Sequence, residues 1–264
     1  MASTLPENLN IADWLLDARV REGRGDRPAL LTDQSTLTYR EVQTLANRFG
    51  HLLQSAGVEP EQRVIIALPD GPEFVAALFG TLKVGAVVVM VNPQLAVDAI
   101  EYFYTYTRAT VALVHRHTAP VFQAARSAAA SYLKQIIVVG EPGTARAVDG
   151  ASPDLETFPS HRDDAAIWLF SGGTTGKPKA VVQSHGSFAN TTLCYGQGVL
   201  GLTERDITLA VPKLFFGYAT GSNLFFPFSV GGAAALFPEK STAETLFAKI
   251  SRFRPTILVN VRRW

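Results

Sequence analysis

Short apolar runs separated by longer mixed segments recur along the first half of the chain. The runs lie at residues 64–68, 87–91, 111–114 and 136–139, and we expect helices between them at residues 95–107 and 119–132. Near-continuous apolar strands are typical of a parallel sheet whose two faces are both covered by helices. The pattern therefore predicts a doubly wound α/β unit.

The same alternation restarts after residue 160. Strands are expected at residues 165–170, 207–210, 233–237 and 256–259, with helices at residues 186–200, 217–226 and 243–253. Residues 140–159, in between, contain three prolines and three glycines and predict a boundary. We therefore predict an α/β fold of two stacked doubly wound subdomains, at residues 27–159 and 160–264, after a lead-in at residues 1–26 that contains a helix.

Composition changes this picture little. The chain has 264 residues, 47% of them hydrophobic, and 24 Lys and Arg against 23 Asp and Glu. A net charge of +1 gives no broad electrostatic footprint for nucleic acid or an anionic membrane, so the expected partners are small molecules. The single cysteine, Cys194, is expected in the core and suits a reducing compartment, so we expect a cytoplasmic protein.

Two features argue against other locations. The longest apolar run, residues 74–91, contains Lys83 and two glycines, so a helix followed by a buried strand explains it better than a membrane span. The N-terminal residues lack the basic and apolar regions of a secretory signal.

The densest chemical signal follows the run at residues 165–170. It reads Ser171-Gly172-Gly173-Thr174-Thr175-Gly176-Lys177-Pro178-Lys179. Glycines let backbone N–H groups turn toward an anion, hydroxyls donate further hydrogen bonds, and lysines neutralise charge. The segment predicts a phosphate-binding loop, with a merely flexible loop as the alternative. It is not a Walker A loop, because Ser171 stands at the first glycine position and Pro178 at the Mg²⁺-binding hydroxyl.

This loop resembles the phosphate-loop signature S-[SG]-G-[ST]-T-G-x-P-K-[GA] of the adenylate-forming superfamily, which includes acyl- and aryl-CoA ligases, luciferases and peptide-synthetase adenylation domains. Other segments resemble the same family in the expected order. They are residues 37–42 (Leu-Thr-Tyr-Arg-Glu-Val), residues 82–86 with 91–93, residues 181–185 (Val-Val-Gln-Ser-His) and residues 213–221 (Lys-Leu-Phe-Phe-Gly-Tyr-Ala-Thr-Gly). The aromatic form of the last segment is most similar to the benzoate-CoA ligase group.

The resemblance implies a two-step reaction. A carboxylate attacks the α-phosphate of ATP to give an acyl-adenylate and pyrophosphate, and the thiol of CoA then displaces AMP. Thr174, Thr175 and Lys179 are the expected principal phosphate contacts, while Lys177 occupies a variable position and ranks second. An acyl pocket is implied at Phe215, Phe216, Tyr218 and Gly221, although the aromatic residues fit a core equally well. Phe216 stands where many relatives carry His, which favours an aryl acid such as benzoate.

The family pattern also implies that only an N-terminal portion of such an enzyme is present. Its relatives continue past the equivalent of Val261 with segments for adenine, ribose, Mg²⁺ and a catalytic lysine, so we assign no catalytic residue and no Mg²⁺ ligand here. We expect this portion to be inactive alone. A shortened non-catalytic binding protein and a peptide-synthetase adenylation fragment remain alternatives, although residues 215–228 lack the acid that an amino-acid substrate needs.

The remaining polar candidates favour plain structural roles. His115 and His117 lack the ligands that would complete a metal site, so we predict none and place them in a surface loop. Asp163 and Asp164 fit the solvated edge of a strand. His185, just beyond the loop, either helps to position it or caps the next helix.

Overall fold

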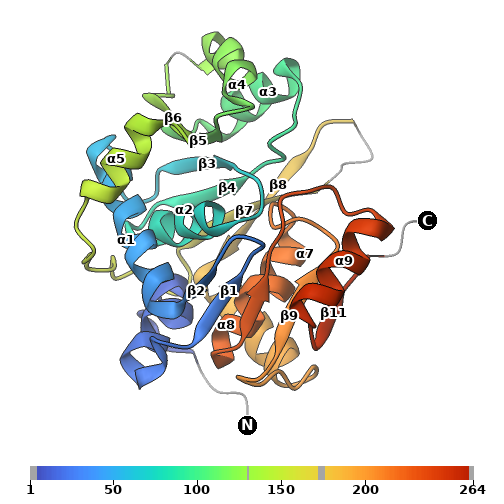
Figure 1. Cartoon of the computed structure of the whole chain (residues 1–264). Coiled ribbons are helices and arrows are strands. Elements are labelled where there is room, and N and C mark those ends of the chain that lie inside the picture. Colours follow the sequence, from blue (N-terminus) through green and yellow to red (C-terminus); the bar gives the residue numbers. More distant parts are fainter. Residues whose placement is uncertain (1–4, 130, 172–175, 262–264) are drawn as a thin grey trace.

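Two predominantly parallel β-sheets, with helices between and around them, make up the protein (Figure 1). The computed structural model describes residues 5–129, 131–171 and 176–261. Within these residues the first sheet has the strand order β6-β5-β3-β4-β7-β8 and the second has the order β11-β9-β10-β1-β2. The predicted mixed α/β fold with two stacked sheets is confirmed.

The first sheet contains the four apolar runs of the first predicted subdomain and the first run of the second one. Its strands are β3 (Arg63–Ala67), β4 (Val87–Met90), β5 (Val111–His115), β6 (Gln135–Val139), β7 (Ala165–Ser171) and β8 (Lys179–Ser184). Pairing is parallel except between β7 and β8, which form an antiparallel hairpin at the sheet edge. β8 was not predicted, because its side chains are largely exposed and its sequence has no continuous apolar run.

The second sheet combines the end of the described chain with its beginning. Its strands are β1 (Pro28–Leu31), β2 (Thr36–Thr38), β9 (Ile207–Ala210), β10 (Ala233–Ala235) and β11 (Ile257–Val259). β1 lies parallel to β10, and β2 returns antiparallel to β1. The boundary expected at residues 140–159 therefore does not separate the two sheets, since β7 and β8 join the first and β1 and β2 join the second.

Helices occupy most of the connections. The α-helices are α1 (Tyr39–Ser55), α2 (Pro72–Lys83), α3 (Val97–Thr107), α4 (Ala119–Ala124), α5 (Pro142–Gly150), α6 (His185–Thr191), α7 (Gly217–Thr220), α8 (Phe226–Val230) and α9 (Ala243–Phe253). Wider π-helical turns occur at Asp13–Asp17, Val20–Arg24, Thr192–Gln197 and Gly221–Phe225, and a 3₁₀ turn at Ala125–Ala129. The lead-in helix is confirmed, whereas α5 lies where a linker was expected, because Pro142 fits a first helical turn.

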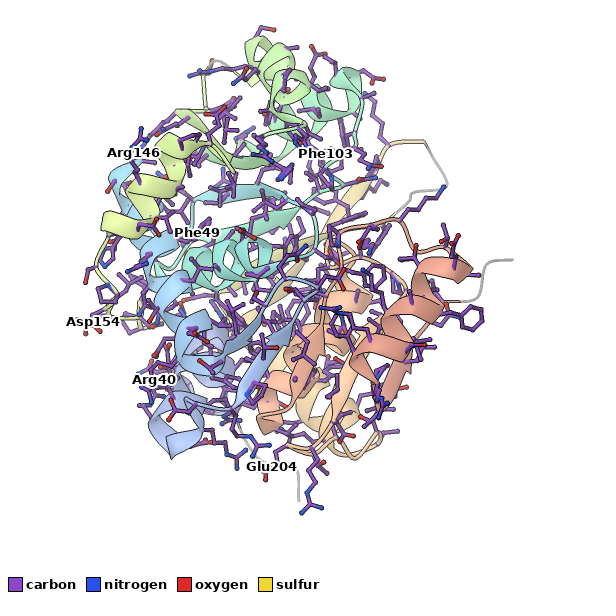
Figure 2. All side chains as sticks on the ribbon, viewed as in Figure 1. Arg40, Phe49, Phe103, Arg146, Asp154 and Glu204 are labelled. Carbon is purple, nitrogen blue, oxygen red and sulfur yellow. The ribbon has the colours of Figure 1, made fainter. Side chains whose placement is uncertain are left out.

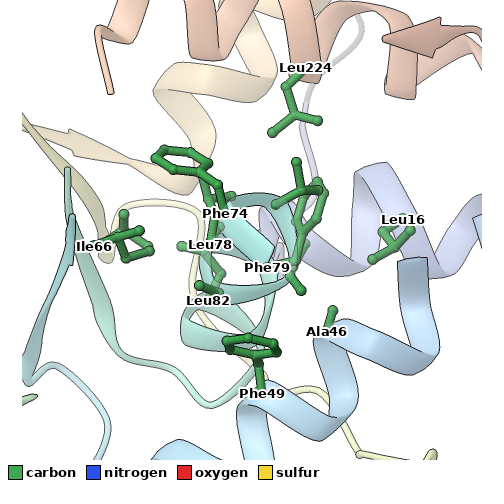
Figure 3. Close-up of a cluster of buried hydrophobic side chains, with 14 of the residues drawn as sticks. Leu16, Ala46, Phe49, Ile66, Phe74, Leu78, Phe79, Leu82 and Leu224 are labelled. Atoms are coloured by element: carbon green, nitrogen blue, oxygen red, sulfur yellow. The ribbon is translucent and has the colours of Figure 1, made fainter. Parts of the chain in front are cut away.

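α2 is the central helix between the sheets. Every residue from Phe74 to Lys83 is buried, as expected for a helix that is apolar on nearly all sides, and the buried Lys83 ammonium pairs with the Asp17 carboxylate at 2.8 Å. Figure 3 shows Phe79 of α2 between Ala46 of α1 and Leu224. Phe79 also stacks on Phe228 of α8, with ring centroids 5.6 Å apart. This packing fixes the turn before α2, which carries a residue of the candidate site.

Candidate functional site

The predicted phosphate loop lies at the tip of the β7–β8 hairpin. Phe170 pairs with Ala180, and Ser171 with Lys179, at the last paired positions before the tip. Four predicted loop residues lie outside the described residues: Gly172, Gly173, Thr174 and Thr175. Because β7 runs parallel to β4, the tip leaves the sheet at the carboxyl edge, where open α/β sheets bind ligands.

The described residues after the tip, 176–180, are called the loop limb here. Gly176 has a φ of 95°, a left-handed conformation that favours glycine. The Lys177 ammonium nitrogen lies 5.3 Å from the centroid of the Tyr102 ring, on α3. Lys179 opens β8 with an exposed side chain. The two lysines therefore have different surroundings, while their predicted ranking as phosphate contacts stays a prediction.

Within the second predicted element, residues 213–221, the part at residues 213–218 is called the aromatic segment here, and hydrogen bonds hold it from several sides. The Leu214 N–H donates to Asp70 Oδ1 at 2.9 Å, and Thr220 Oγ1 donates to the Leu214 carbonyl at 2.6 Å. Lys213 Nζ donates to the carbonyl of Phe237 at 2.7 Å and lies over its ring. The segment is thus fixed from the turn after β3, from α7 and from the residues that follow β10.

The four predicted pocket residues differ in exposure. Phe216 and Tyr218 are 53% and 55% exposed, whereas Phe215 packs against the core and lies 4.4 Å from the Phe216 ring between centroids. Gly221 is buried and begins a π-helical turn. The structure therefore presents Phe216 and Tyr218 outward beside a core-packed Phe215, and their role in substrate binding stays a prediction.

Gly217 brings the two elements together. A Cβ atom at this position would overlap the side chain of Leu169 on β7, two residues before Ser171. A residue with a side chain at position 217 would push the Leu169 side chain aside, so glycine lets the aromatic segment lie against the strand that leads into the phosphate loop.

Asp70 is the most perturbed acid of the site. It follows β3 in the turn before α2, and its side chain is almost fully buried. Burial raises its pKa to about 6, partly offset by the charge of Lys213 and by the Leu214 N–H. Burial also lowers the pKa of Lys213 to about 8, which the charges of Asp70 and Glu239 oppose. The two groups thus place a weakly solvated acid and base behind the aromatic segment.

A cleft of about 480 Å³ opens in front of Asp70. Its lining comes from the carboxyl ends of strands in both sheets and includes Asp70, Pro93, His115, Gly140 and Pro238. Phe216, Tyr218 and the loop limb do not belong to this lining. By position the cleft is a candidate for a ligand.

The two neighbouring histidines line the same cleft. The rings of His115 and His117 meet edge to face, with centroids 4.8 Å apart. Burial lowers the pKa of His115, assisted by His117 and Arg116. Over the described ranges, His, Cys, Asp and Glu side chains form no group of three or more that could hold a metal ion.

His185 lies at the start of α6, away from solvent. Its Nδ1 accepts a hydrogen bond from the Ile11 N–H at 3.0 Å, and burial lowers its pKa to about 4. The capping bond of α6 comes instead from the preceding Ser184, whose Oγ accepts from the Ser187 N–H. In the structure His185 therefore ties the lead-in helix to the base of the hairpin, and its predicted help to the loop remains untested.

Two minor expectations have different outcomes. Asp163 is exposed, and Asp164 accepts a hydrogen bond from the His161 N–H at the edge before β7, as expected for a solvated strand end. Cys194 was expected in the core, but it is exposed, because it lies on the outer face of the π-helical turn Thr192–Gln197.

Sequence reasoning missed Asp70 and Lys213. Asp70 stands in the sequence Pro69-Asp70-Gly71-Pro72, which is typical of a turn, and turn aspartates are usually exposed. The available signal was its place directly after a buried parallel strand, where ligand-binding residues of α/β folds gather. Lys213 is the first residue of the aromatic segment, but the hydrophobic pattern of the sequence did not indicate that its side chain is partly buried.

The described part of the chain has no helix that is long and apolar enough to cross a membrane.

Comparisons with known proteins agree with the resemblance. The sequence profile of the family described as AMP-binding enzyme matches residues 16–264. The benzoate–CoA ligase of Thauera aromatica is 33% identical, over 98% of this chain and 50% of the relative. A 4-hydroxybenzoate–CoA/benzoate–CoA ligase of Rhodopseudomonas palustris is 32% identical, over 96% of this chain and 47% of the relative. The chain thus spans about half the length of these curated relatives.

A solved structure extends the similarity to three dimensions. The crystal structure of the anthranilate CoA ligase AuaEII in complex with anthranoyl-AMP superposes with a TM-score of 0.92 at 35% identity. The match covers 98% of this chain and 50% of that one.

Proposed function

This chain belongs to the AMP-binding enzyme family, and we propose that it forms the N-terminal half of an ATP-dependent ligase that joins an aromatic carboxylic acid to CoA. Its ancestry is that of the adenylate-forming CoA ligases. The observation that carries the proposal is the contact of Gly217 with Leu169, because it sets the aromatic segment beside the strand that enters the phosphate loop. An acid on that segment would lie near the phosphates that it attacks.

In this proposal the loop acts on the leaving group. When the carboxylate attacks the α-phosphate of ATP, negative charge accumulates on the departing pyrophosphate, and Lys179 with the loop hydroxyls stabilises it. The thiol of CoA then displaces AMP from the acyl-adenylate. The described residues offer no fit for Mg²⁺, so we derive no step from a metal ion here.

The aromatic segment would select the acid. Phe216 and Tyr218 present ring surfaces, and rings packed face to face or edge to face favour a flat aromatic substrate. The hydrogen bond that Asp70 accepts from the Leu214 N–H, and the one that Thr220 donates to the Leu214 carbonyl, fix this surface before the acid binds. The names of the relatives, which include benzoate and anthranilate ligases, support the same class of substrate.

A chimera tests the proposal. Residues 1–264 are joined to the second half of the Thauera aromatica benzoate–CoA ligase, and ATP–pyrophosphate exchange and thioester formation are measured with benzoate, anthranilate and hydroxybenzoates. We expect both activities in the chimera and neither in the 264-residue chain alone. Lys179→Ala should slow adenylate formation by about 100-fold or more, as the loss of one charge contact in the transition state does, and Lys177→Ala much less. A folded chimera that activates none of these acids would contradict the proposal.

A further inference from the structure

Three aromatic side chains of α3 form a platform under the β7–β8 hairpin. This aromatic platform consists of Tyr102, Phe103 and Tyr106. Phe103, labelled in Figure 2, meets Phe170 of β7 edge to face at 4.7 Å between centroids. Tyr106 contacts the same Phe170 ring at 5.9 Å. The platform therefore lies against the strand that leads into the loop tip.

The platform also reaches the strand that leaves the tip. The Tyr102 hydroxyl donates a hydrogen bond of 2.6 Å to the carbonyl of Pro178, and its ring faces the Lys177 ammonium at 5.3 Å. The Tyr106 hydroxyl accepts a longer hydrogen bond, 3.4 Å, from the Ala180 N–H. One helix face thus contacts three of the residues through which the chain returns from the tip.

Pro178 strengthens the effect of the Tyr102 hydrogen bond on the backbone of the loop limb. The ring of Pro178 fixes its φ, and the residue before a proline is restricted to extended conformations. With these two residues already restricted, a hydrogen bond to the Pro178 carbonyl fixes the direction in which the limb enters β8. β8 is an edge strand with few buried side chains, so the sheet itself holds this limb from one side only.

We infer that Tyr102 is a positioning residue of the phosphate loop: its hydroxyl fixes the Pro178 carbonyl, and its ring holds the Lys177 ammonium as part of the scaffold. The inference rests on the proposed function, because it assigns the two lysines of one loop to different tasks. Lys177 orients the limb against α3, and Lys179 meets phosphate.

Binding of inorganic pyrophosphate to the 264-residue chain tests this assignment by titration calorimetry. Tyr102→Phe removes only the hydroxyl and should weaken binding about 3- to 10-fold, the usual effect of one hydrogen bond. Tyr102→Leu also removes the ring and should weaken it about 2- to 5-fold further. Lys177→Ala should weaken binding in the wild-type chain but not in the Tyr102→Leu chain, because the ring it contacts is gone. Tyr132→Phe, at a more exposed tyrosine outside the aromatic platform, serves as the control.

Hydrogen exchange separates this inference from the proposed function. In Tyr102→Phe the amides of Lys177, Lys179 and Ala180 should exchange several-fold faster without any ligand, while those of β3 stay unchanged. Faster exchange in a chain that binds no pyrophosphate would support the positioning role and count against the phosphate site. Unchanged exchange and unchanged binding in Tyr102→Phe, or equal Lys177→Ala effects with and without the Tyr102 ring, would overturn the inference.

Discussion

The aromatic segment and the loop limb lie in neighbouring parts of one candidate site but are held in different ways. The aromatic segment is fixed through buried partners, Asp70 and Thr220, by hydrogen bonds of 2.9 and 2.6 Å. The loop limb is fixed through Tyr102, which is half-buried, and Tyr106, which is exposed. A buried polar group that loses its partner costs far more than an exposed one, because water cannot replace the partner. In the candidate site the aromatic segment is therefore held by buried hydrogen bonds, whereas the loop limb is held by contacts that are partly open to water.

The largest predicted effect concerns Asp70, one of the buried partners of the aromatic segment. Its folded pKa of about 6 lies above the usual value near 3.8, so the folded chain binds a proton that the unfolded chain has released. Its contribution to stability is therefore present below about pH 4 and is lost as the pH rises through 6. We expect the difference in unfolding free energy between wild type and Asp70→Asn to fall by on the order of 3 kcal/mol from pH 4 to pH 7. Urea unfolding at several pH values measures it, and a flat difference would show that Asp70 is well solvated.

For His185, at the buried base of the β7–β8 hairpin, we predict the opposite dependence of stability on pH. Its folded pKa of about 4 lies below the usual 6.5, and protonation of Nδ1 would break the bond from the Ile11 N–H. The contribution is present above pH 6.5 and is lost as the pH falls toward 4. His185→Asn retains an acceptor near the Nδ1 position but cannot titrate, so its deficit relative to wild type should shrink by on the order of 3 kcal/mol from pH 7 to pH 4. An unchanged deficit would mean that the folded imidazole titrates near its usual pKa, as an exposed one does.

The secondary structure and the candidate site differ in how much of each could be predicted from the sequence. The strands at residues 64–68 and 87–91 were predictable, because a run of buried β-branched residues fits little else. β1 has four residues, including a proline, and β2 has three, including two threonines. Both strands were missed, because such short segments show no clear hydrophobic pattern. The phosphate loop was visible as a motif, but Asp70 was not, since its partner Leu214 lies 144 residues away. Local chemistry can be predicted from sequence, whereas burial set by distant segments cannot.

Thr220→Val tests the second anchor of the aromatic segment. Valine has nearly the same shape as threonine, but it leaves the buried Leu214 carbonyl without the hydroxyl that donates to it. We expect a loss of about 1–3 kcal/mol in unfolding free energy, the usual cost of an unpaired buried group. Thr220→Ser keeps the hydroxyl and should lose clearly less. A larger loss in Thr220→Ser than in Thr220→Val would instead assign the role of Thr220 to its methyl group, which valine retains and serine lacks.

Tyr106→Phe should have the smallest effect and completes the comparison on the exposed side. The Tyr106 side chain is 41% exposed, and its hydroxyl receives the Ala180 N–H at 3.4 Å, a long hydrogen bond that water can replace. Phenylalanine keeps the ring contacts with Phe170 and Trp168. We therefore expect a change within about 0.5 kcal/mol in unfolding free energy, as for most surface substitutions. A loss as large as that of Thr220→Val would show that the loop limb is anchored as firmly as the aromatic segment. The difference between the two regions would then lie in their chemistry alone and not in how they are held.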